Sequence, residues 1–152
     1  HFYSDNNSCL RTAAWRSVPI PNLDFGEDQA FAFELLKNGY GKAYAKNAVV
    51  YHSHDYPPEI AEQRAYQEAR FFYGYFQYRF PAEDIDAART LHGLNLADAE
   101  WAAERGIASH QLQARMAQNE ARVRGWSRAM RDSGVAARSR PVERVGIGPR
   151  SS

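Results

Sequence analysis

Residues 26–54, GEDQAFAFELLKNGYGKAYAKNAVVYHSH, contain the patterns that decide the predicted fold. Apolar residues recur at helical spacing in its first half, and Gly39 stands where a helix C-cap belongs, so we predict a helix over about 27–38. KAYAKNAVVY, residues 42–51, predicts one or two short strands with a turn at Lys46-Asn47.

The rest of the chain divides into a loop-rich start, a helical middle and an irregular end. Residues 57–132 read as mostly helical, with Gly93 and Gly106 as expected breaks. The segment 133–152 is rich in Gly, Pro, Ser and Arg and has no period, which predicts a disordered basic tail. We therefore expect three parts: 1–56, 57–132 and 133–152.

Length and composition indicate about one domain with a real core. The chain has 152 residues, of which 44% are apolar, and no apolar run is long enough to span a membrane, so we expect a soluble protein. Its one cysteine, Cys9, allows no internal disulfide and suits a reducing compartment. The chain begins at His1 without a leader-like segment, so we expect a piece of a longer polypeptide.

Positive charge gathers at the C-terminal end. Residues 1–100 hold 9 Lys and Arg against 14 Asp and Glu, whereas residues 101–152 hold 10 Arg against 4 acids. Such a cluster can bind nucleic acid or an anionic membrane surface. Between 115 and 131 the arginines alternate with apolar residues at helical spacing, and a solvated helix face is the simpler interpretation.

Two pairs of polar residues are candidates for chemistry. Glu27 and Asp28 stand at a helix start, where carboxylates cap free backbone amides, and Asp28 at the mouth of a cleft is also a candidate base. His52 and His54 point to the same side of an extended strand, which suits a metal site and equally a polar surface.

Two segments carry more information through their order and spacing: FYSDNNSCLRTAAW and PIPNLDFGEDQAFAFELLKNGYGKAYAKNAVVYHSHDY. Together they resemble the second half of the catalytic domain of an inverting GT-A-type glycosyltransferase of family 2, especially its rhamnosyltransferase-like members. The resemblance covers about residues 1–80. It implies an α/β fold, a partial GT-A (Rossmann-like) fold without its N-terminal nucleotide-binding half, followed by a mostly helical C-terminal extension. The matching residues are Asp5, Asn7, Ser8 and Arg11 in the first motif, Gly26, Glu27, Asp28 and Gln29 in the second, and 49–54 in the third.

The resemblance implies a mechanism. Asp28 would take the proton of an acceptor hydroxyl as that oxygen attacks the anomeric carbon of a nucleotide-diphosphate sugar. Mg²⁺ or Mn²⁺, with His52 or His54 close to it, would neutralise the departing diphosphate. Gly26 would give the backbone room beside the substrate, and Glu27 would orient the loop. The first motif would line the acceptor side of the cleft.

The chain also departs from the family. The nucleotide-binding strands and the DxD metal motif that precedes the Glu-Asp pair are missing. An Asp-Ile-Asp occurs at 84–86, but it follows that pair at an expected helix start and is not taken as the metal motif. The QxxRW motif of processive members is also absent. We therefore expect residues 1–152 alone to bind donor poorly. The implied acceptor is a saccharide or a lipid-linked saccharide, and the implied location is cytoplasmic, with peripheral association at the inner face of the cell membrane; no specific nucleic acid is expected. A non-catalytic helical interaction module, presenting the aromatic residues of 66–80, and an anionic-surface binder are the alternatives.

Overall fold

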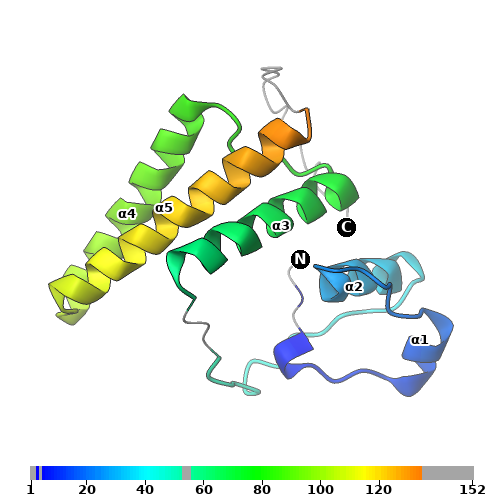
Figure 1. The fold of residues 1–152 in the computed structure, drawn as a ribbon. Coiled ribbons are helices and arrows are strands. Elements are labelled where there is room, and N and C mark those ends of the chain that lie inside the picture. Colours follow the sequence, from blue (N-terminus) through cyan, green and yellow to red (C-terminus); the bar gives the residue numbers. More distant parts are fainter. Residues whose placement is uncertain (1–2, 4, 53–55, 135–152) are drawn as a thin grey trace, which may run out of the picture.

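The computed structural model describes residues 3, 5–52 and 56–134 of the chain (Figure 1). Helices contain 66% of these residues. Predictions for 53–55 and for the tail from 135 to 152 lie outside the described residues. In chain order the described elements are a 3₁₀ turn, η1 (Asp5–Asn7), and the helices α1 (Thr12–Ser17), α2 (Glu27–Lys37), α3 (Pro58–Phe76), α4 (Asp84–Arg105) and α5 (Ser109–Asp132).

The predicted α/β, partial GT-A (Rossmann-like) fold is wrong, because the part of the chain that the structure describes contains no strand and no sheet. Residues 42–51 have no regular structure apart from the predicted turn at Lys46-Asn47. The side chains of Tyr44 and Tyr51 are 92% and 105% exposed. A strand is stabilised by a neighbour that pairs with its backbone, and none of the described segments pairs with this one.

Helix α2 begins and ends almost where the sequence predicts. Gly39 follows its last turn with a left-handed φ of 82°. The Gly39 N–H donates to the carbonyl of Leu36 at 3.1 Å, and the Tyr40 N–H donates to the carbonyl of Leu35 at 3.1 Å. These two bonds form a Schellman cap, which satisfies carbonyls at the helix end and turns the chain away. The predicted C-cap is confirmed.

Helices α3, α4 and α5 pack together, with both α3 and α4 against α5 (Figure 1). The mostly helical character predicted for residues 57–132 is confirmed. Gly106 ends α4 with a left-handed φ of 62°, as expected. Gly93 does not interrupt α4, since one glycine inside a helix of 22 residues costs only about 1 kcal/mol.

Small residues allow α3 and α5 to approach closely. Ala65 and Ala69 of α3 are one turn apart and are 3% and 0% exposed. Opposite them lies Gly125 of α5, where an added Cβ atom would stand 2.3 Å from the carbonyl oxygen of Glu62. The larger core side chains then fill the space beside this contact. They are Val123, Trp126 and Met130 of α5, with Tyr66, Tyr73, Phe80, Leu91 and Leu94 packed against them.

Aromatic rings join α2 to the second half of α3. The Phe71 ring fills the space beside Gly26, and the rings of Phe33 and Phe76 meet edge to face with their centroids 5.2 Å apart. The hydroxyl of Tyr75 donates to Glu34 Oε1 at 3.1 Å. Helix α3 is therefore buried on two sides, by α5 along its alanines and by α2 along its aromatic rings.

Candidate functional site

The second motif forms the start of α2. Gly26 is the N-cap residue, with a left-handed φ of 76°, and its carbonyl accepts the N–H of Ala30 at 2.9 Å. Glu27 is exposed, whereas Asp28 is half-buried in the first turn. Oδ1 of Asp28 accepts the backbone N–H of Gln29 at 2.7 Å. One carboxylate oxygen thus serves a backbone amide that the helix leaves without an internal partner.

The first motif contacts the second motif and the residue just before the third. The backbone N–H of Tyr3 donates to Gln29 Oε1 of the second motif at 3.2 Å, and the Tyr3 hydroxyl donates to Ser8 Oγ at 2.9 Å. The side-chain amide of Asn7 donates to the carbonyl of Ala48, next to the third motif, at 2.8 Å. Three segments that are far apart in the sequence therefore form one polar cluster.

An open hollow of about 970 Å³ lies beside this cluster. Its volume is at the upper end of the range for small-molecule pockets. Asn7 and Ser8 contribute to its wall. Asp28 is not part of the wall. It lies one helical turn before Ala32, and Ala32 is a wall residue. The remaining wall residues are Tyr3, Asn6, Cys9, Leu10, Leu35, Leu36, Tyr40, Gly41, Lys42, Ala43, Tyr44, Ala45, Ala48, Val49 and Val50.

Arg11 and Gln29 are not among the residues of this wall. Arg11 is exposed and is the N-cap residue of α1. Asp5 begins η1. Gln29 borders a different hollow, between α2 and α3. The space beside Gly26, which the resemblance assigns to substrate, holds the ring of Phe71.

The described residues do not provide a set of metal ligands. No group of three or more His, Cys, Asp or Glu side chains able to hold an ion occurs among them. His52 is exposed, while His54 lies outside the described part of the chain. One imidazole does not define a coordination sphere. The ion expected near these histidines stays a prediction.

Most arginines of α5 pair with carboxylates of the neighbouring helices. Arg124 and Arg128 both reach Glu62 of α3, with N–O distances of 3.1 and 2.8 Å, and Arg115 reaches Asp98 of α4 at 3.0 Å. These contacts favour the interpretation of a helix face over a free cationic surface. Within the described residues, none of the helices combines the length and the apolarity needed to cross a bilayer.

A second cavity, where α3 meets α5, was not predicted. Three arginines line it together with two aromatic rings, Arg64, Arg115, Arg122, Phe25 and Tyr56. Part of it has a sequence signal, because Arg115 and Arg122 are seven residues apart and so share a helix face. Arg64 and the rings reach the cavity from other elements, and sequence spacing gives no sign of them.

Comparisons with models of protein families, with curated proteins and with solved structures found no match.

Proposed function

We propose that residues 3–52 contribute to a sugar-transferring enzyme in which Asp28 accepts a proton from an acceptor hydroxyl. The observation that supports this most is the contact of the three motif segments around Tyr3, Asn7 and Gln29. If these segments were only local caps and turns, they would have no reason to meet. Their meeting beside a ligand-sized hollow agrees with a shared binding role.

The proposed step balances as follows. The acceptor hydroxyl loses its proton to the carboxylate of Asp28, and its oxygen forms a bond to the anomeric carbon of the nucleotide-diphosphate sugar. The bond from that carbon to the diphosphate breaks, and the diphosphate leaves with the electron pair, so the configuration inverts. A divalent ion, when bound, would neutralise charge on the leaving diphosphate.

Asp28 suits the role of a base because it is a carboxylate in the first turn of α2, next to Gln29, whose side chain accepts the N–H of Tyr3. An aspartate is ionised at neutral pH, and it is half-buried at the positive end of the α2 dipole. Glu27, one residue earlier, is exposed and fits a role in orienting the loop better. The acceptor, a saccharide or a lipid-linked saccharide, and a location at the inner face of the membrane stay predictions of the resemblance.

The helical interaction module is less well supported. Its binding surface would be the aromatic residues of α3, and these pack inside the chain: Phe71 lies beside Gly26, and Phe76 meets Phe33 of α2. Among the aromatic residues of 66–80, all are half-buried except Tyr78, which is 57% exposed.

The test is transfer, or slow donor hydrolysis, by the polypeptide that carries residues 1–152, with a panel of nucleotide-diphosphate sugars. Asp28→Asn keeps the size of the side chain and the ability to cap a helix, so the fold is expected to remain. The matched control is Asp24→Asn, at an exposed aspartate one turn upstream. Equal turnover of both variants with every donor would contradict the proposal.

A further inference from the structure

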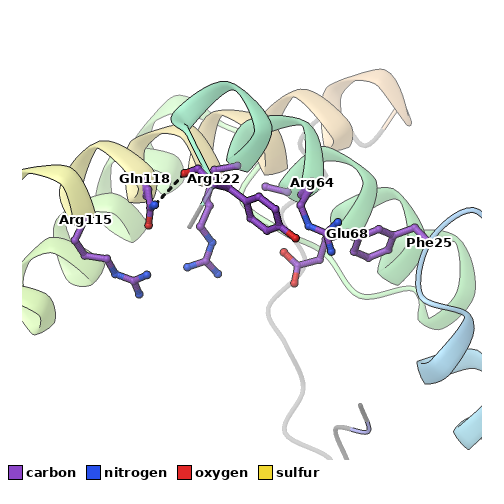
Figure 2. A pocket seen from close by; sticks show the side chains of 9 residues that line it. Phe25, Arg64, Glu68, Arg115, Gln118 and Arg122 are labelled. Carbon is purple, nitrogen blue, oxygen red and sulfur yellow. Dashed lines mark hydrogen bonds between the residues drawn. The ribbon is translucent and has the colours of Figure 1, made fainter. Parts of the chain in front are cut away.

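A cavity of about 320 Å³ lies where the first half of α3 meets α5, with the end of the preceding loop and Phe25 beside it (Figure 2). We call it the arginine pocket. Its volume is at the lower end of the range for small-molecule sites. The residues that line it are Phe25, Tyr56, Ala61, Arg64, Ala65, Glu68, Arg115, Gln118 and Arg122.

Aromatic rings hold two of its arginines in place. The Arg64 guanidinium lies over the Tyr56 ring, 5.0 Å from its centroid, and over the Phe25 ring, at 5.6 Å. The Arg122 guanidinium lies 4.9 Å from the centroid of Trp126. Such stacking positions a guanidinium without using its hydrogen-bond donors. Neither arginine forms an ion pair with any carboxylate in the described residues.

The other charged groups of the pocket are already engaged. Glu68 Oε2 accepts the indole N–H of Trp126 at 2.8 Å, and Arg115 pairs with Asp98 at 3.0 Å. If Asp98 offsets Arg115 and Glu68 offsets one further arginine, one guanidinium charge still remains. Figure 2 shows the guanidinium groups of Arg115 and Arg122 pointing to the same side of the helices. The pocket is therefore an open cavity with a net positive charge.

Gln118 closes one end of the pocket and fixes the loop that brings Tyr56. Its side-chain amide donates to the carbonyl of Tyr56 at 3.0 Å (Figure 2). The ring under Arg64 is thus tied to α5, which carries Arg122. The two stacked arginines, Arg64 and Arg122, come from different helices, and their relative position is held by this bond and by the close contact of α3 with α5 at Gly125.

We propose that the arginine pocket binds the phosphate group of a phosphate ester, with Arg64 and Arg122 as its main contacts. A guanidinium matches phosphate oxygens through two parallel N–H donors. The negative charge of a phosphate is also opposite in sign to the one guanidinium charge that Asp98 and Glu68 leave without an offset. The ester is either a soluble metabolite or the headgroup of an anionic lipid. This site is separate from the Asp28 cluster and does not rest on sugar transfer.

The first experiment titrates the full chain with inorganic phosphate and follows the arginine side-chain N–H signals by NMR. The expected result is a shift of the Arg64 and Arg122 signals, and binding that is about tenfold or more weaker in Arg122→Gln. The matched control is Arg105→Gln, because Arg105 also stacks on a tryptophan, 4.8 Å from the ring of Trp101, but lies outside the pocket.

Several results would overturn the proposal. They are shifts confined to other arginines, equally tight binding of acetate, or the same affinity in Arg122→Gln and Arg105→Gln with both folded by circular dichroism. If Arg122→Gln does not fold, Arg64→Gln takes its place, since Arg64 stacks on rings at the edge of the α3–α5 contact rather than on Trp126.

A second experiment distinguishes the two sources of phosphate. Vesicles of phosphatidylcholine with and without phosphatidic acid are sedimented with wild type, Arg122→Gln and Arg105→Gln. If wild type and Arg105→Gln bind vesicles with phosphatidic acid and Arg122→Gln does not, the pocket binds a lipid headgroup. Binding of inorganic phosphate without vesicle binding assigns it to a soluble ester. If Arg122→Gln binds both inorganic phosphate and the vesicles as wild type does, the result contradicts the phosphate site.

Discussion

Gly125→Ala tests the close contact between α3 and α5. The new Cβ atom would lie 2.3 Å from the carbonyl oxygen of Glu62, 3.0 Å from Ala65 Cβ and 3.0 Å from the backbone nitrogen of Tyr66. Two of these three are backbone atoms of a helix, so they cannot move aside as a side chain can. The helices must separate, which costs about 1–3 kcal/mol, while alanine in place of glycine returns about 1 kcal/mol of helix propensity. The contact is short enough to place the cost at its upper end, and we expect a net loss of about 1–2 kcal/mol in the free energy of unfolding.

The assay is urea and thermal denaturation followed by circular dichroism at 222 nm. A loss of this size lowers Tm by roughly 2–8 °C for a chain of this length. Gly93→Ala is the matched control, because Gly93 also lies inside a helix but nothing is within 4 Å of an added Cβ. That change should raise stability by about 0.5–1 kcal/mol. If Gly125→Ala is as stable as wild type or gains as much as Gly93→Ala, the helices do not approach as described.

Three further predictions concern other parts of the chain. Gly26→Ala should lose about 1–3 kcal/mol of stability, because its φ is 76° and the Cβ would lie 2.5 Å from Phe71. The loss should be larger than that of Gly39→Ala, because Gly39 has a similar φ of 82° but open space around an added Cβ. Equal losses in a denaturation assay would count against the Phe71 contact. Burial, and a hydrogen bond to the carboxylate of Glu34, raise the pKa of Tyr75 above its usual 10.0, so its stabilising contribution is complete below pH 10 and is lost as the pH rises through the higher folded value. Unfolding at pH 9 and 11 should therefore show a steeper loss in wild type than in Tyr75→Phe, and identical slopes would contradict the assignment. Arg122→Gln should weaken phosphate binding about tenfold while Arg105→Gln leaves it unchanged, as measured by the NMR titration.

The helices were largely predictable because their signals are local. The apolar spacing and Gly39 were enough to define α2, and the glycine at 106 was enough to mark the end of α4. The predicted break at Gly93 failed because glycine lowers helix stability only slightly when neighbours on both sides favour the helix.

The strand prediction failed for a different reason. Val49, Val50 and Tyr51 have high β-propensity, but a strand depends on a partner that may come from anywhere in the sequence. None of the described segments supplies one, and these side chains remain 73%, 51% and 105% exposed. The local sequence shows that these residues favour a strand, but it does not show whether another segment pairs with them.

The candidate sites were predictable to the extent that their residues are close in the sequence. The segments around Asn7 and Gln29 were singled out by their motifs, and the hydrogen bond from Tyr3 to Gln29 joins them, while the role of these residues stays a prediction. The arginine pocket was missed because Phe25, Tyr56 and Arg122 meet only through the packing of α3 on α5.

The measurement that tests the central claim most directly is the rate of sugar transfer by Asp28→Asn relative to wild type, with the affinity for the donor measured in the same preparations. The account predicts a fall in rate of roughly 10² to 10⁴ with donor affinity nearly unchanged, because only the proton acceptor is lost. A rate equal to that of wild type and of Asp24→Asn would contradict it, and would leave Asp28 as a residue that caps the start of α2.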